Sequence, residues 1–225
     1  MAPKPDLTLE SKQVKYAISS RAEMAYEGLR DRIISGEFPP GTPLQEPQLC
    51  EQLNVSRSPL RQSLTRLTSE GLVEQIHGVG WFVRKLSPLE CIQTMELRRT
   101  CEASAAALAA EKILPDEIPA LLDLGKDVEA VCERGVFEEI QQAELRFHRH
   151  VLALSKNPEM IRMFENILTV SLTLTLEGEV SSVPPESADH LAVAKAIAGG
   201  DPSVAFDSVW QHFVRPLAKW RAAEE

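Results

Sequence analysis

The 225-residue sequence lacks the long apolar runs and the cysteine patterns that would place it in a membrane or an oxidising compartment. No apolar run reaches the roughly 18 residues of a membrane-spanning helix. The N-terminal residues have no apolar segment of the kind found in a secretory signal. The four cysteines form no CxxC pair and show no regular spacing. We therefore expect a cytoplasmic protein with reduced thiols and no membrane partner.

Basic residues are fewer than acidic ones, 24 against 33, and they are unevenly distributed. The formal net charge is −9, which taken alone argues against a nucleic-acid partner. Residues 1–86 nevertheless carry a net charge of +1, whereas residues 87–225 carry −10. A neutral domain still binds DNA when its cations share one face. We expect a polar, disordered tail at 1–14, one domain at 15–86, and a second domain with a different partner at 87–225.

Local signals in the first domain predict three helices. Apolar residues at helical spacing favour a helix over about residues 21–35, and a short helix over about 46–53 follows. Ser56 or Ser58 is placed to cap a third helix, and Pro59 lies in its first turn, where the missing N–H costs nothing.

A β-hairpin is predicted after the third helix. Gly71 ends that helix, and the apolar period then changes to two. Segments 72–76 and 81–84 flank a turn that contains His77 and Gly78. The order of helix, helix, turn, helix and hairpin is that of a winged helix-turn-helix.

The third helix has a polar face opposite its leucine stripe. On a helical wheel this face carries Ser58, Arg61, Gln62, Thr65 and Arg66. Arginine presents a rigid fork of donors that suits phosphate and the guanine edge, and hydroxyls and amides reach phosphates or bases. An arbitrary helix with this face would simply be solvated, but the surrounding elements favour DNA contact. Arg57 at the helix start is a further candidate, as are His77 and Gly78 at the hairpin tip, although His77 alone is equally a plain turn residue.

The segment "GTPLQEPQLCEQLNVSRSPLRQSLTRLTSEGLV" resembles the GntR family of bacterial transcription regulators over about residues 20–85. The resemblance implies operator contacts from Ser56, Arg57, Ser58, Arg61, His77 and Gly78. Pro47 stands where members often carry an arginine, so we expect no phosphate or base contact from the second helix. One recognition helix reads only a few base pairs, so we expect a homodimer on a short palindromic operator in double-stranded DNA.

The second domain is predicted to be all-α. Ser87, Pro88 and Glu90 form a capping box for a long helix that runs to about residue 112. Helices are predicted at about 116–134, 137–155, 158–178, 186–199 and 201–223. Segment 168–176 alternates with period two, as a strand does, but its leucines also recur at helical spacing. A lone strand would have no pairing partner, so we predict a helix with a polar inner face.

Histidines are concentrated in this acidic domain. Glu144 and His148 are four residues apart on one helical face, and His190 and His212 lie on later helices. One carboxylate and three imidazoles are a possible ligand set for a divalent cation, but scattered histidines are more often structural. His150 points off that face and is expected at the surface.

The segments "AELRFHRHVLALSKNPEM" and "DHLAVAKAIAGGDPSVAFDSVWQHF" resemble the FCD effector domain of FadR-like regulators, over about residues 88–222. The resemblance implies that Glu144, His148, His190 and His212 bind a divalent metal: zinc, or alternatively nickel or manganese. Glu144 replaces the usual aspartate. The resemblance also implies a small carboxylate effector, with Arg98 as the inward arginine that binds it; an ion pair with Glu102 is compatible with this role.

Together these features predict a mostly α protein with an N-terminal winged helix-turn-helix domain, a β-hairpin wing and a C-terminal helical bundle of FCD type. We expect a repressor controlled by the effector, and not an enzyme, because a zinc hydrolase would need an HExxH-type helix that is missing. An acyl-CoA sensor would not need the histidines. The remaining alternative is a metal-free regulator with structural histidines, in which Arg98 and polar side chains bind the effector.

Overall fold

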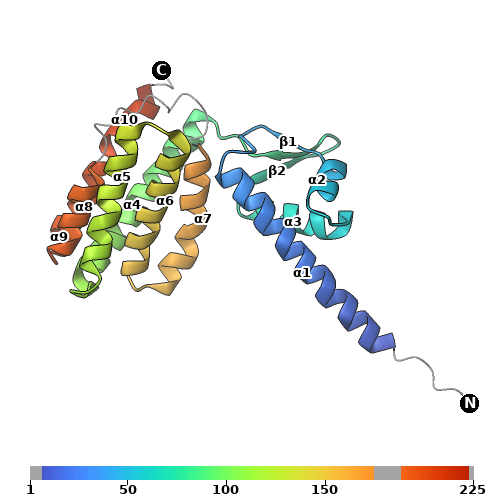
Figure 1. The fold of residues 1–225 in the computed structure, drawn as a ribbon. Helices are drawn as coiled ribbons and strands as arrows, with labels where there is room; N and C mark the ends of the chain where they lie inside the picture. The colour runs from blue at the N-terminus through green and yellow to red at the C-terminus, as the bar shows by residue number, and fades with distance from the viewer. Residues whose placement is uncertain (1–6, 175–188, 223–225) are drawn as a thin grey trace, which may run out of the picture. The chain divides into compact units, whose positions relative to one another are not determined.

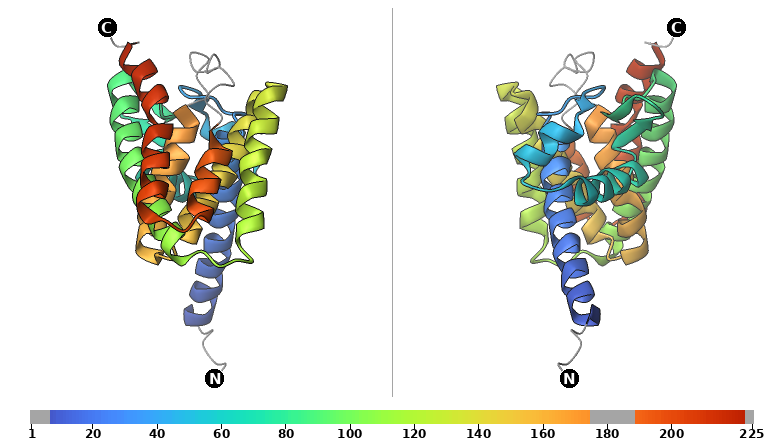
Figure 2. Two further views of the ribbon diagram at one scale, coloured as in Figure 1. Left: turned by 90° about the vertical axis from the view of Figure 1, so that its left-hand side faces the viewer. Right: turned by 90° about the vertical axis from the view of Figure 1, so that its right-hand side faces the viewer.

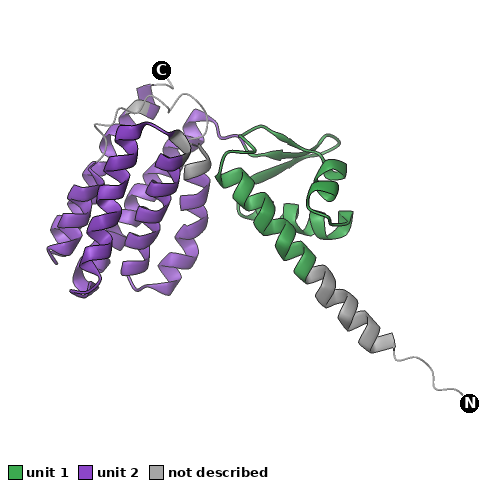
Figure 3. Ribbon diagram, in the orientation of Figure 1, with its two compact units in different colours: residues 1–84 green, residues 85–225 purple. Residues whose placement is uncertain are grey.

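The chain folds into two compact units. The computed structural model describes residues 7–174 and 189–222. One unit ends at Arg84 and the other begins at Lys85 (Figure 3). We call them the N-terminal unit and the C-terminal unit. This division lies two residues before the boundary expected from the sequence, 86/87.

The N-terminal unit combines helices with a small antiparallel sheet (Figure 1). Its helices are α1 (Leu7–Ile34), α2 (Glu46–Gln52) and α3 (Arg57–Ser69). Its strands are β1 (Pro43–Leu44), β2 (Val73–Ile76) and β3 (Gly80–Val83), in the order β1-β3-β2. The predicted hairpin is confirmed, with Val73 opposite Val83 and Ile76 opposite Gly80.

The core of this unit forms where α1 and α3 pack together. Leu29 and Ile33 of α1 are fully buried, as are Leu60, Leu64 and Leu67 of α3. These are the apolar positions that helical spacing predicts. Ser63 adds a polar link, because its hydroxyl donates to the Ala22 carbonyl at 2.6 Å. Packing against α1 therefore fixes the rotation of α3 and leaves its opposite face exposed.

The structure differs from the prediction at two places in this unit. Helix α1 begins at Leu7 and not near residue 21, so residues 7–14 are helical where a disordered tail was expected; residues 1–6 lie outside the described part. Residues 7–20 contain neither proline nor glycine, the two strong helix breakers. Strand β1 was not predicted, because its two residues are too short to show a period; Leu44 pairs with Trp81.

The C-terminal unit is entirely helical over the residues that the structure describes. Its helices are α4 (Pro88–Lys112), α5 (Ile118–Arg134), α6 (Phe137–Leu154), α7 (Pro158–Leu174), α8 (His190–Ala198), α9 (Pro202–His212) and α10 (Val214–Ala222). The capping box at the start of α4 is confirmed, with Ser87 and Glu90 satisfying each other's backbone N–H. Segment 168–174 is helical, as predicted, whereas 175–178 and 186–188 lie outside the described residues.

One predicted helix is broken in two. The sequence predicts a single helix over 201–223, but α9 ends at His212 and α10 begins at Val214. Pro216 explains the break, because in a continuous helix its ring would clash with the carbonyl of His212. Phe213 at the break and Leu217 of α10 lie in the core, where they are 1% and 2% exposed.

Helix α4 forms the centre of the C-terminal unit. It contacts each of α6 to α10, and α9 and α10 (red) lie one after the other beside α4 (green) in Figure 2. Four of its alanines are fully buried: Ala103, Ala105, Ala106 and Ala109. Small side chains let neighbouring helices approach closely, so α4 brings α6, α8 and α9 around one interior. Within the described part of the chain, no helix is long and apolar enough to cross a membrane.

Candidate functional sites

The exposed face of α3 carries the first candidate site. A surface hollow is lined by Arg57, Ser58, Arg61, Gln62 and Thr65. Ser56 precedes the helix in extended conformation, is exposed, and makes no side-chain cap. Its hydroxyl therefore does not occupy the first backbone N–H groups of α3. These six residues form what we call the α3 surface.

The hairpin borders this surface. A second hollow joins Arg57 and Arg61 of α3 to Pro47 of α2 and to Gly80 and Trp81 of β3. His77 and Gly78 lie exposed at the tip between β2 and β3. Gly78 has a φ of 76°, which glycine adopts without strain. The tip thus presents the His77 imidazole next to Gly78, whose backbone is not covered by a side chain.

Glu46 connects the elements of this surface. Its carboxylate accepts from the Arg61 guanidinium at 2.9 Å and from the Trp81 indole N–H at 3.3 Å. One side chain of α2 therefore links α3 to the β2–β3 hairpin. The sequence analysis did not identify this role, which depends on contacts between residues 15 and 35 positions apart.

Arg66 is exposed, as the sequence analysis expected, but it does not line the hollow of the α3 surface. It pairs with Glu23 at 2.8 Å and with Glu70 at 3.3 Å, and its guanidinium lies 3.5 Å from the centre of the Tyr26 ring. At about 100° per residue, Arg66 is rotated by about 140° from Arg61 and by about 40° from Gln62, so it lies at the edge of the α3 surface. Arg66 therefore ties α3 to α1.

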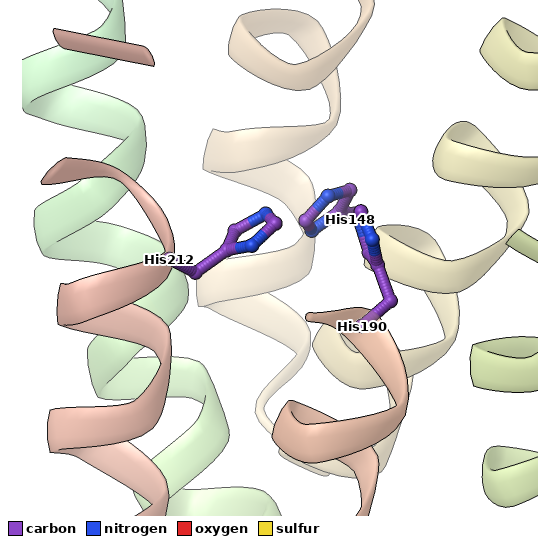
Figure 4. A group of neighbouring side chains, drawn as sticks. All are labelled: His148, His190 and His212. Carbon is purple, nitrogen blue, oxygen red and sulfur yellow. The ribbon is translucent and has the colours of Figure 1, made fainter. Parts of the chain in front are cut away.

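The second candidate site is a group of three histidines in the C-terminal unit. His148 of α6, His190 of α8 and His212 of α9 point toward one another (Figure 4). One ring nitrogen of each lies within 4.8 Å of the others. His148 and His190 are 4% and 2% exposed. The fold thus brings together the three histidines that the sequence analysis selected.

Two carboxylates bind the outer nitrogens of this group. His148 Nδ1 pairs with Glu102 and His212 Nδ1 pairs with Asp189. His148 Nε2 and both ring nitrogens of His190 are buried and have no hydrogen-bond partner among the described residues. Buried polar atoms without partners are rare and costly, so this centre is suited to a ligand that binds nitrogen.

The protonation states of His148 and His190 suit binding of a ligand through their ring nitrogens. Burial lowers the pKa of His148 and lowers the pKa of His190 well below the ordinary value. Burial alone would raise the pKa of Glu102, but the charge of Arg98 and the hydrogen bonds from His148 and Arg98 outweigh it and lower this pKa to about 2. An ionised carboxylate only accepts, so Nδ1 of His148 carries the proton and Nε2 keeps its lone pair. Neutral imidazoles of this kind are common metal ligands.

Glu144 does not join the group. Among the described residues, the possible ligand set contains the three histidines alone. Burial and then the charge of Glu144 raise the pKa of Cys132, which places this carboxylate beside α5. Three imidazole nitrogens without a carboxylate suit Zn²⁺ or Ni²⁺ better than Mn²⁺.

Arg98 lies next to the histidines and is 5% exposed. Its Nε donates to Glu102, and its Nη1 donates to Ser171 at 3.3 Å. Ser171 belongs to the polar inner face that was predicted for α7. Arg98, Glu102 and His148 line a cavity of about 10 Å³, room for about one water molecule. Binding of a larger anion therefore requires side chains to move.

Glu102 and Asp189 were not predicted to contact the histidines. The sequence analysis identified Glu102 only as the partner of Arg98. Asp189 directly precedes His190, yet its partner is His212, and that pairing depends on how α8 and α9 pack.

Family models match both units. The model for "Bacterial regulatory proteins, gntR family" matches residues 21–83, and the model for the FCD domain matches residues 93–215. A probable D-xylose utilization operon transcriptional repressor of Paenarthrobacter nicotinovorans is 28% identical over 184 residues, covering 80% of each chain. The Nta operon transcriptional regulator of Aminobacter aminovorans is 35% identical over 136 residues, covering 60% of this chain and 63% of its own.

Solved structures share the fold. A putative GntR transcriptional regulator from Rhodococcus sp. RHA1 superposes with a TM-score of 0.77 at 23% identity, over 91% of this chain and 99% of its own. Escherichia coli McbR/YncC gives a TM-score of 0.76 at 21% identity, over the same shares. The chain belongs to the GntR family of bacterial transcription regulators and carries a C-terminal FCD domain.

Proposed function

We propose that this regulator is a repressor that binds a short palindromic operator as a homodimer. The α3 surface supports this proposal, because two exposed arginines share it with hydroxyl and amide side chains at a helix start. Free N–H groups and the positive end of the helix dipole add attraction for phosphate there. The name of one similar protein, the D-xylose utilization operon transcriptional repressor, supports repression of transcription rather than activation.

Each part of the α3 surface has a proposed role. Arg61 reads a base edge in the major groove, while Arg57 and Ser56 at the helix start contact phosphate. Ser58, Gln62 and Thr65 contact phosphates or bases next to the base that Arg61 reads. His77 and Gly78 approach the minor groove. We assign no DNA contact to Arg66, because its side chain contacts Glu23 and Tyr26 of α1.

Glu46 would orient the Arg61 guanidinium for its contact with DNA. The 2.9 Å ion pair holds the guanidinium in one place while 62% of the Arg61 side chain stays exposed. A held guanidinium loses less conformational entropy when it binds a base. Operator binding therefore uses a side chain that is already oriented.

The C-terminal unit is proposed to bind a divalent metal and a small carboxylate effector. His148, His190 and His212 would hold the metal, which would supply a Lewis-acidic site for a carboxylate oxygen. Arg98 would bind the same anion through its guanidinium, after movement of the residues around the small cavity. The buried ring nitrogens without partners carry this part of the proposal.

Operator selection from random DNA duplexes, followed by binding at fixed salt, tests the DNA-binding proposal. Arg61→Ala should cost about 1–3 kcal/mol and relax specificity at one position of each half-site. Arg57→Ala should weaken all sequences alike. Arg134→Ala, which removes an exposed arginine of α5, serves as the control. Unchanged binding by both Arg57→Ala and Arg61→Ala would remove the α3 surface from the proposal.

The metal-free regulator remains the second candidate. The pairing of His148 with Glu102 and of His212 with Asp189 favours it, because these histidines already have structural partners. Elemental analysis of protein equilibrated with zinc, nickel or manganese distinguishes the two. His148→Ala should lose the metal, whereas His150→Ala, two positions away on α6, should retain it. A wild-type protein that binds none of these metals supports the metal-free candidate.

A further inference from the structure

Asp189 occupies the N-cap position of α8 but does not cap the helix. An aspartate at this position normally accepts a hydrogen bond from the second or third backbone N–H of its own helix. No such bond forms at Asp189, and its carboxylate pairs with His212 Nδ1 instead. The local stabilisation that capping offers is therefore not used here.

The next helix shows the ordinary arrangement. Asp201 is the N-cap of α9, and its carboxylate accepts from Ser203 N at 2.8 Å and from Val204 N at 3.3 Å. The two aspartates have the same residue type and the same position relative to their helices. They differ in backbone conformation, with ψ of 19° at Asp189 and 113° at Asp201. They differ also in that a ring of the histidine group lies within reach of Asp189 alone.

Glu102 makes the equivalent contact on the other side of the group. It is 8% exposed, and one carboxylate oxygen faces Arg98 while the other faces His148 Nδ1. Arg98 is in turn bound to Ser171. His148 is thus held by a chain of buried polar contacts that runs from α7 through α4 to α6.

We infer that Glu102 and Asp189 are positioning residues that orient His148 and His212 as metal ligands; this inference rests on the metal site of the proposed function. A carboxylate that accepts from Nδ1 fixes the tautomer, so the lone pair lies on Nε2. The rings then face the centre: the centroid of His148 is 5.5 Å from that of His212, and the centroid of His190 is 4.5 Å from that of His212.

Two further consequences follow from the geometry. Glu102 and Asp189 supply negative charge beside the histidines, although Glu144 is not in the ligand group. They do so without contacting the metal themselves. Glu102 is also shared between His148 and Arg98, so the metal ligand and the anion-binding side chain have a common partner.

Asp189→Asn is the decisive variant, because the Asp189 side chain is 49% exposed and its replacement should not affect folding. The zinc dissociation constant is measured in the full-length protein by competition with a chromophoric chelator. We expect Asp189→Asn to weaken zinc binding by about 10- to 100-fold. The thermal midpoint of the metal-free protein should change little.

The second variant is Glu102→Gln, which should weaken zinc binding by a similar factor. It also leaves Arg98 without its charged partner, so a lower midpoint is expected for this variant alone. Co²⁺ provides a spectroscopic readout: its visible absorption bands report coordination geometry, and they should differ from wild type in both variants. A residue that merely stabilises the fold would leave these bands unchanged.

Asp201→Asn is the matched control, since it alters an N-cap aspartate remote from the histidine rings. It should retain wild-type zinc affinity and the wild-type Co²⁺ spectrum. Wild-type affinity and spectrum in Asp189→Asn would overturn the inference for Asp189, and the same result in Glu102→Gln would overturn it for Glu102. Failure of the wild-type protein to bind zinc or cobalt would instead overturn the metal site itself, so the two failures are distinguishable.

Discussion

His190 is the most unusual residue of the histidine group. It is 2% exposed, and neither of its ring nitrogens has a hydrogen-bond partner within the described parts of the chain. Burial, followed by the charges of His212 and His148, lowers its pKa well below the ordinary value. The folded protein therefore keeps this imidazole neutral under conditions in which the unfolded chain protonates it.

This difference predicts acid sensitivity in the metal-free protein. Below about pH 6.5 the unfolded state binds more protons than the folded state, so stability falls as pH falls toward the folded pKa. Each such histidine contributes at most about 1.4 kcal/mol per pH unit. Denaturant unfolding of the C-terminal unit with chelator present, at about pH 7.5 and about pH 5.5, measures the effect. His190→Leu should show a shallower dependence; an identical slope would contradict the assignment.

Arg61 and Arg66 should behave differently although both lie on α3. Arg66 contributes a contact with the Tyr26 ring and partly exposed ion pairs, so Arg66→Ala should lower the stability of the N-terminal unit by about 1 kcal/mol. Its operator affinity, measured well below the unfolding temperature, should change little. Arg61→Ala should show the opposite pattern. If Arg66→Ala lost operator affinity without loss of stability of the N-terminal unit, Arg66 would be a DNA-contacting residue.

At the scale of elements, the contact between α5 and α8 positions His190. Gly125 of α5 lies against the start of α8: a Cβ there would be 3.0 Å from Leu191 Cα and 3.2 Å from the His190 carbonyl oxygen. Both neighbours are backbone atoms, so relief requires α8 to move. The absence of a side chain at residue 125 thus fixes the place of a histidine 65 positions away along the chain.

Gly125→Ala should therefore weaken metal binding. Overpacking should destabilise the C-terminal unit by about 1–3 kcal/mol, and the gain in helix propensity, about 1 kcal/mol, offsets part of this. The displaced His190 should lower zinc affinity as well, which titration with a competing chelator would detect. Lys126→Ala, at the next and exposed position of α5, should keep both properties. Wild-type zinc affinity in Gly125→Ala would show that α8 is positioned by other contacts.

At the scale of the whole molecule, regulation requires that effector and operator bind with linked affinities. If the effector changes operator affinity by some factor, then operator DNA must change effector affinity by the same factor. A coupling of about 1–3 kcal/mol, or about 5- to 150-fold, is typical. Candidate carboxylates are titrated with and without operator duplex, in the presence of zinc. Equal effector affinity in the two titrations would remove the coupling, while His148→Ala should abolish it and leave operator binding intact.

Much of this molecule follows from local sequence. The leucine spacing of α3, the capping box at Ser87 and the glycines of the hairpin act over a few residues, so they predict the elements and their order. The match to two family patterns also predicts the histidines that meet. Pro216 is a local signal as well; reading it as a helix breaker would have predicted the end of α9 at His212.

Other features depend on tertiary structure alone. Arg66 and Arg61 are both exposed on one helix, but only the packing of α1 decides that Arg66 pairs with Glu23 and covers the Tyr26 ring. Helical spacing puts Glu144 on the same side of α6 as His148, yet the carboxylates that contact the histidines come from α4 and from the start of α8. Periodicity fixes which residues share a face of one helix. Which atoms meet between helices depends on the separation and rotation of those helices, and these are set by the buried alanines of α4 and by Gly125.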